Sequence, residues 1–152
     1  MKIQLTIDQP NLDGYFWASP QNDKLDPARE FYNCWEYCME AQCTELYGPS
    51  ILEIFTTTEL EEIIPKWAKL IPPGGKIILG GTDLYILSKE SIRRTKDIGT
   101  INDLLFNKPY ALRSITSVES TREFLETLGF RINNINLSYT DFTYTVEGIK
   151  NG

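Results

Sequence analysis

Residues 58–81, TELEEIIPKWAKLIPPGGKIILGG, decide the fold of this chain of 152 residues. Thr58 and Glu61 have the spacing of a capping box, in which each side chain accepts a hydrogen bond from the other residue's backbone N–H group, so a helix is predicted to begin here. Its apolar residues recur at steps of three and four positions and form one buried stripe: Leu60, Ile63, Ile64, Trp67, Ala68 and Ile71. The turn at 72–75 ends the helix, and residues 76–81 are predicted to form a strand buried on both faces.

Short strands are predicted on the N-terminal side of this unit. Residues 2–7 alternate polar and apolar side chains, residues 15–18 are rich in aromatic side chains, and residues 43–47 form a third short run before a Gly-Pro pair. On the C-terminal side, residues 84–106 carry a helical pattern that is broken near Gly99.

The last part of the chain is predicted to be a helix followed by an antiparallel hairpin. Thr116 and Glu119 form a second candidate capping box, and an apolar face follows it as far as Gly129. Residues 130–137 and 142–149 then alternate with period two and are separated by a short polar turn. The order of elements predicts one α/β domain over residues 1–152.

Composition excludes several kinds of function. The formal net charge is -6, from 15 basic and 21 acidic side chains, which disfavours binding to nucleic acid or to anionic membranes. The sequence contains no histidine, so Ser-His-Asp, Cys-His and His-metal mechanisms are excluded. No apolar run approaches the roughly 20 residues needed to cross a bilayer.

The three cysteines, Cys34, Cys38 and Cys43, lie close together in the sequence. Structural thiols of a reducing, cytoplasmic protein are the simpler interpretation. A soft-metal site is the alternative, because Cys34 and Cys38 would share one face of a helix. We favour the first and predict no metal site, because a closed zinc site needs four ligands and the chain has no histidine to complete it.

Several segments resemble the short class I S-adenosylmethionine-dependent methyltransferases. ELYG at 45–48 with ILE at 51–53 is similar to that family's fourth strand and the turn after it. Residues 60–79 resemble the next helix, its PGG turn and the fifth strand, and residues 116–130 resemble the last helix and its exit into the final two strands. The resemblance implies a Rossmann-like sheet, mostly parallel with an antiparallel C-terminal hairpin and helices on both faces.

The resemblance also implies S-adenosylmethionine as cofactor and places its site at the strand ends. Asp8, Ser19, Ser50 and Asp83 are the candidate cofactor-binding residues, and Glu53 is the candidate catalytic residue. Two of the family's features are missing: the glycine-rich loop after the first strand, and the acidic residue after the second, where Ser19 stands. For two of these residues we favour a structural interpretation: Asp8 as a loop-capping aspartate before Pro10, and Glu53 as a solvated carboxylate near a helix start.

Two functions are therefore predicted. The first is a small methyltransferase with a divergent cofactor site, which positions a methyl donor against an oxygen or nitrogen of a small molecule or glycan. The alternative is a catalytically inactive methyltransferase fold that acts as a binding, assembly or regulatory module with a protein partner. The cleft above the strand ends discriminates between them, because Ile7, Gln9, Pro10 or Trp17 filling it would exclude the enzyme.

Overall fold

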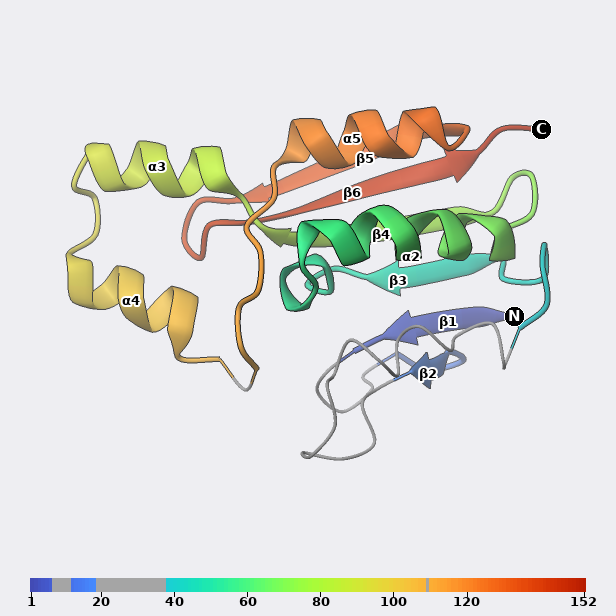
Figure 1. Cartoon of the computed structure of the whole chain (residues 1–152), viewed down its shortest axis with the longest axis horizontal. Helices are drawn as coiled ribbons and strands as arrows, with labels where there is room; N and C mark the ends of the chain where they lie inside the picture. The colour runs from blue at the N-terminus through green and yellow to red at the C-terminus, as the bar shows by residue number, and fades with distance from the viewer. Residues whose placement is uncertain (7–11, 19–37, 109) are drawn as a thin grey trace.

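The computed structural model describes residues 1–6, 12–18, 38–108 and 110–152, which build one mixed sheet (Figure 1). Its strands follow the order β2-β1-β3-β4-β6-β5. Their bounds are β1 Lys2–Leu5, β2 Phe16–Ala18, β3 Glu45–Gly48, β4 Lys76–Thr82, β5 Phe130–Ser138 and β6 Thr143–Lys150.

The pairing confirms the predicted fold class. β2, β1, β3 and β4 run parallel to their neighbours, whereas β6 pairs antiparallel with both β4 and β5. The chain is therefore a Rossmann-like α/β fold, with a sheet that is mostly parallel and has an antiparallel C-terminal hairpin.

The described helices are α2 Thr57–Leu70, α3 Leu84–Ile92, α4 Ile98–Phe106 and α5 Val118–Thr127, with a 3-10 turn η2 at Leu52–Ile54. α2 and α5 cover the same face of the sheet (Figure 1). Their apolar side chains share one core with Ile77 and Leu79 of β4 and Val146 of β6, all fully buried. We also expected helices on the opposite face; residues 19–37, where such helices would precede β3, lie outside the described residues.

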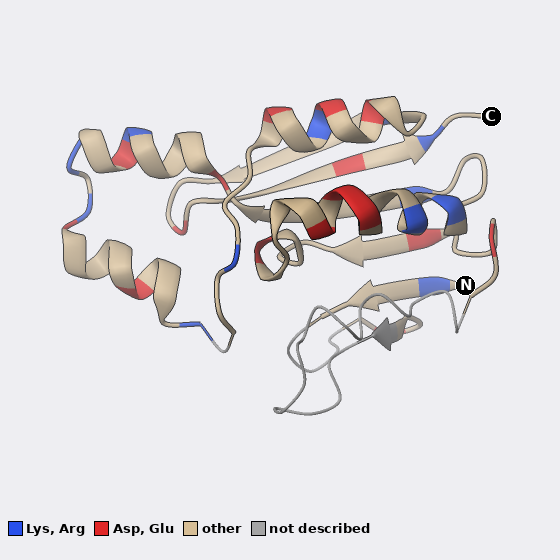
Figure 2. Ribbon diagram, in the orientation of Figure 1, with Lys and Arg blue, Asp and Glu red and all other residues tan. Residues whose placement is uncertain are grey.

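Helix α2 begins at a different capping box from the predicted one. Thr56 is the N-cap: its Oγ1 accepts from the backbone N–H of Glu59 at 3.3 Å, and its own N–H donates to Glu59 Oε2 at 2.7 Å. Thr56 and Thr58 are each followed three residues later by a glutamate, Glu59 and Glu61, so two registers of the same box fit the sequence and only packing selects one. Acidic residues gather in the first half of α2 and basic ones near its end, which suits the helix dipole (Figure 2).

Two other helix boundaries also differ from the predicted ones. α5 is capped by Ser117 with Ser120, not by Thr116 with Glu119. The helical pattern breaks at 93–97, not at Gly99, because Asp97 caps α4 by accepting from the N–H of Thr100 at 2.9 Å.

On the opposite face of the sheet, three charged side chains form a row at the N-terminal ends of the parallel strands. Lys2, Glu45 and Lys76 are paired across β1, β3 and β4, and Glu45 Oε2 lies 3.3 Å from Lys2 Nζ. The phenol of Tyr15 also donates to Glu45 Oε1 at 2.5 Å. Lys76 and Ile78 are only half-buried, so the prediction that this strand is buried on both faces was wrong for its first residues.

No helix in the described part of the chain is long and apolar enough to cross a membrane.

Candidate functional site

The carboxyl ends of the parallel strands form the edge at which α/β sheets bind ligands. From β1 the chain continues to β2 on one side, and then crosses to β3 on the other side of β1. The topological switch point therefore lies between β1 and β3. Ser50 follows β3, Glu53 lies in η2, and Asp83 follows β4 directly. The structure therefore places these three candidates at one edge, whereas Asp8 and Ser19 lie outside the described residues.

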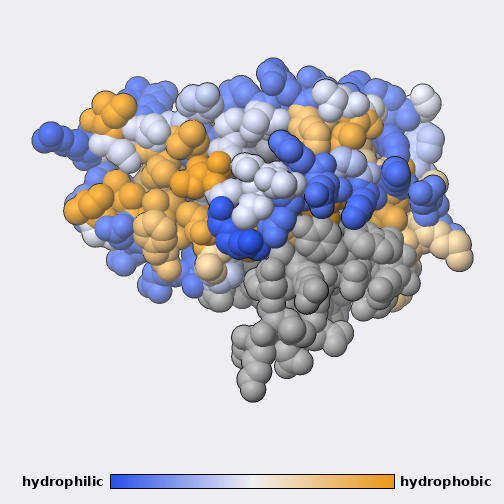
Figure 3. All heavy atoms as spheres, in the orientation of Figure 1, coloured by the Kyte–Doolittle hydropathy of each residue, from blue (hydrophilic) through white to orange (hydrophobic). Residues whose placement is uncertain are grey.

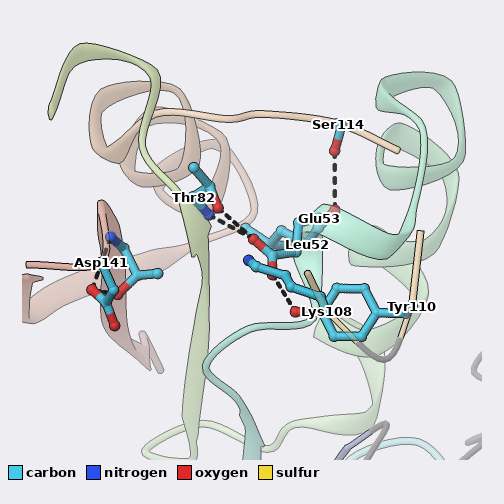
Figure 4. A network of polar contacts seen from close by, with 8 residues as sticks. Leu52, Glu53, Thr82, Lys108, Tyr110, Ser114 and Asp141 are labelled. Atoms are coloured by element: carbon cyan, nitrogen blue, oxygen red, sulfur yellow. Dashed lines mark hydrogen bonds and ion pairs between the residues drawn. The ribbon is translucent and has the colours of Figure 1, made fainter. Parts of the chain in front are cut away.

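Glu53 is buried, with 2% of its surface exposed. Its Oε2 accepts from the backbone N–H of Thr82 at 3.0 Å and from Thr82 Oγ1 at 2.6 Å (Figure 4). The carboxylate thus fixes η2 against the end of β4. The interpretation as a solvated carboxylate was wrong.

The other oxygen of Glu53 binds the segment that leads toward α5. Lys108 Nζ lies 2.5 Å from Oε1, and the hydroxyl of Tyr110 donates to the same oxygen. The Lys108 side chain is only 17% exposed, so this ion pair is largely withdrawn from water. An ionised carboxylate offers about four acceptor positions, and four donors fill them here.

Backbone bonds strengthen this attachment. The N–H of Arg113 donates to the carbonyl of Glu53 at 2.7 Å, and Ser114 Oγ donates to the carbonyl of Leu52 at 3.1 Å. Figure 4 shows Glu53 at the centre of these contacts, with the side chains of Thr82, Lys108 and Tyr110 around it and Ser114 bound to the neighbouring Leu52. The sequence indicated Glu53, and it placed Thr82 at the same edge because residues 80–83 follow a predicted strand. It gave no signal for Lys108 or Tyr110, which are distant along the chain.

Asp83 joins two helices. It is 2% exposed; Oδ1 accepts from the N–H of Ile86 at 2.7 Å, and Oδ2 accepts from the N–H of Val118 at 2.9 Å. It therefore caps α3 and also binds the first residue of α5. Both interactions place negative charge at a helix N-terminus, where the helix dipole stabilises it.

Ser50 is the candidate with an exposed side chain. The turn that carries it packs tightly against β4, because a Cβ on Gly80 would lie 2.4 Å from the carbonyl oxygen of Pro49 and 2.1 Å from that of Tyr144. Only glycine allows this approach of three backbones. The turn is thus fixed while the Ser50 hydroxyl faces solvent.

A second buried polar cluster was not predicted. The Tyr144 hydroxyl lies 2.5 Å from Thr116 Oγ1 and 2.6 Å from Thr121 Oγ1, which links β6 to α5. Burial raises the pKa of Tyr144 to about 12. The phenol therefore stays neutral and holds structure; nothing in the sequence marks it, since the three residues share no motif.

The described cysteines are buried free thiols. Burial raises the pKa of Cys38, and raises that of Cys43 to about 11, so neither is activated as a nucleophile or a thiolate ligand. Among the described residues no group of three metal-ligating side chains is close enough to hold an ion. Cys34 lies outside these residues, so its part in the predicted thiol cluster stays a prediction.

Comparison with solved structures finds methyltransferases. The chain is similar to magnesium protoporphyrin IX methyltransferase from Synechocystis PCC 6803 with bound SAH, with a TM-score of 0.53, 13% identity, and coverage of 88% of this chain and 50% of that one. It is also similar to an O-methyltransferase family protein from Burkholderia thailandensis, with a TM-score of 0.54, 14% identity, and coverage of 90% and 36%.

A third similar structure is the complex between the Haloferax volcanii Trm112 methyltransferase activator and the putative methyltransferase, with a TM-score of 0.51, 11% identity, and coverage of 94% of this chain and 64% of that one. The chain thus spans between about a third and two thirds of the length of these three proteins. No protein-family model matches the sequence, and no curated protein matches it. At these identities the similarity establishes the fold alone.

Proposed function

We propose that this chain is a methyltransferase-fold protein whose strand-end edge has become a structural junction, and that it acts as a binding or assembly module. One observation carries the proposal: Glu53, the candidate catalytic carboxylate, is buried and receives four hydrogen-bond donors from the chain itself. A general base needs an acceptor position within reach of the substrate's proton. Glu53 offers none unless Thr82, Lys108 or Tyr110 moves away.

Asp83 supports the same interpretation. Each of its oxygens accepts a backbone N–H group at a helix start, so releasing it to bind cofactor hydroxyls would remove the N-cap of α3 and a contact to α5. Losing such a cap costs about 1 kcal/mol. The missing glycine-rich loop after β1 is consistent with a lost cofactor function.

A small S-adenosylmethionine-dependent methyltransferase with a divergent site is the second candidate. The observation that favours it is the switch point between β1 and β3, with the exposed Ser50 beside it. In this function Asp8, Ser19, Ser50 and Asp83 would bind the cofactor, Asp83 after release from the two helix starts. The methyl acceptor would be a small molecule or glycan. Catalysis would then depend on proximity and orientation of the two reactants.

Isothermal titration of the full chain with S-adenosylmethionine, and separately with S-adenosylhomocysteine, tests the two functions. The proposal expects no heat at millimolar ligand. Binding tighter than about 100 μM, roughly 5.5 kcal/mol, would overturn it in favour of the enzyme.

A matched pair of variants then locates any binding. Ser50→Tyr would obstruct the switch point, whereas Ser88→Tyr makes the same change at an exposed position of α3. Loss of binding in the first variant alone would place the cofactor at the strand ends.

A further inference from the structure

The outer edge of β5 is unusually well suited to pair with another strand. β5 ends the sheet, and no strand among the described residues pairs with its outer side. Protected edge strands carry lysine, proline or a bulge. Here the bulge lies between Ile132 and Asn134, so the open segment that follows it, Asn134–Ser138, has regular backbone, no charged residue and no proline.

Apolar side chains of the open segment face solvent. Ile135 and Leu137 are 38% and 46% exposed. They pair with Val146 and Tyr144, so they lie on the face that α5 covers. The ten residues of α5 extend about 15 Å and the nine of β5 about 30 Å, so the helix covers only part of the strand.

The exposed apolar surface continues beyond the strand. Leu137 and Tyr139 line a shallow hollow of about 190 Å³ together with Tyr85 and Val118. Tyr85 is 64% exposed and Tyr139 is 50% exposed. Figure 3 shows further apolar side chains gathered over α3 and α4, the end of the molecule at which β5 finishes. Exposed apolar surface of this kind commonly marks an interface.

We propose that the open segment pairs antiparallel with the same segment of a second copy of this chain, about a two-fold axis at Asn136. Asn136 then lies opposite Asn136 of the second copy, and Ile135 lies opposite Leu137 of the second copy. Asn134 lies opposite Ser138 in the same way. The two sheets become one continuous sheet.

The uncharged, alternating sequence of the open segment is compatible with a second copy as the partner. In this register apolar side chains oppose apolar ones on the α5 face, and polar side chains oppose polar ones on the other face, which is how cross-strand pairs stabilise a sheet. A two-fold contact must be self-complementary in this sense. The paired backbone groups of both copies also satisfy each other.

The helices do not obstruct this arrangement. α5 leads into β5 through a short turn, so it lies over the beginning of the strand, and antiparallel pairing places the two beginnings at opposite ends of the contact. The contact is shorter than the whole strand, whereas stable interfaces bury about 800 Å² on each partner. We therefore expect a weak dimer that forms only at high protein concentration. The apolar side chains that line the hollow beside Leu137 add to the contact area.

Light scattering coupled to size exclusion tests the proposal over a range of concentrations. We expect the mass to rise toward twice the chain mass of 17.5 kDa. Asn136→Lys places two ammonium groups opposite each other at the axis and should keep the chain monomeric. Because Asn136 is exposed, the variant should melt at the same temperature as the wild type at concentrations where both are monomers, whereas the dimer adds stability to the wild type at higher concentrations. Asn151→Lys makes the same change at an exposed position after β6 and should still dimerise.

Cysteine cross-linking tests the register and does not depend on the lysine variant's folding. Directly opposed residues of antiparallel strands have the separation that a disulfide requires, so Asn136→Cys should give a covalent dimer on mild oxidation, whereas the wild-type chain with its native cysteines should not. A wild-type monomer at every concentration would overturn the proposal. The proposal would also be overturned if Asn136→Lys still formed a dimer and Asn136→Cys gave no cross-link. Cofactor binding has no part in either readout.

Discussion

Replacing Glu53 by glutamine distinguishes a structural carboxylate from a catalytic one. The amide keeps the shape of the side chain but loses the charge that pairs with Lys108. If the amide oxygen still accepts from Thr82, its NH₂ group faces Lys108 and Tyr110, which are both donors to the second oxygen of Glu53. The Tyr110 hydroxyl can turn and accept from this NH₂ group, but the Lys108 ammonium can only donate. Glu53→Gln therefore replaces the ion pair with Lys108 by an opposition of two donors.

The expected cost follows from the burial of the pair. Removing one partner of a buried ion pair destabilises by about 3–5 kcal/mol. Lys108 is 17% exposed and keeps some contact with water, so we expect about 3 kcal/mol or slightly less. For a domain of this size that corresponds to a melting temperature lower by about 6–12 °C.

Urea unfolding followed by tryptophan fluorescence measures this change, because Trp67 is fully buried beside Phe55 in the core. Glu61→Gln, at an exposed position on α2, is the control and should change the free energy of unfolding by less than about 0.5 kcal/mol. In a double-mutant cycle, Glu53→Gln with Lys108→Met should cost at least about 1 kcal/mol less than the sum of the single variants. A Glu53→Gln chain as stable as the Glu61→Gln control, or an additive cycle, would refute the structural role.

Three further predictions concern positions around the same edge. Asp83→Asn should lower the free energy of unfolding by about 1–2 kcal/mol in urea, because one amide cannot accept from two helix starts as the carboxylate does; an unchanged midpoint would contradict its double role. Burial raises the pKa of Tyr144 from 10.0 to about 12. The neutral phenol therefore contributes its full stabilisation below pH 10, and this contribution is lost as the pH rises through 12. Tyr144→Phe should abolish this part of the pH dependence of the melting temperature. Gly80→Ala should prevent stable folding, because its Cβ would lie 2.1 and 2.4 Å from backbone oxygens. The control Gly81→Ala has no atom closer than 3.5 Å to its new Cβ and should retain a cooperative melting transition. Equal melting temperatures for the two variants would contradict the close approach at Gly80.

The sequence predicted those helices, strands and turns whose residue pattern lies within one short stretch of the chain. The apolar stripe of α2, the PGG turn and the antiparallel hairpin are each complete within a short window, and the structure confirms all three. The alternation holds for the burial of β6 but not for that of β5, where residues 133–137 are all exposed. The helix starts were less certain because Thr56 and Thr58 are both followed by glutamate at the third position. Local sequence cannot distinguish these registers, since the choice depends on how the helix packs on the sheet.

The candidate site was predicted only in part, for a related reason. Position after a strand end identified Ser50, Glu53 and Asp83, because parallel strands bring their carboxyl ends together. The partners that decide what Glu53 does, Lys108 and Tyr110, come from a segment more than fifty residues later. No spacing rule connects Glu53 with Lys108 and Tyr110. The sequence therefore indicated where the carboxylate lies but not that both of its oxygens are already bound by other side chains.

The strand order also has a consequence for synthesis on the ribosome. β6 is inserted between β4 and β5, and it pairs with β4 over seven residues, up to Ile149 opposite Lys76. One side of β4 therefore stays unpaired until almost the last residue of β6 has left the exit tunnel, although β1, β3 and α2 have emerged long before. Through this interval the nascent chain carries an exposed central strand, KIILGGT, which is a site for capture by chaperones or for misassembly between neighbouring chains.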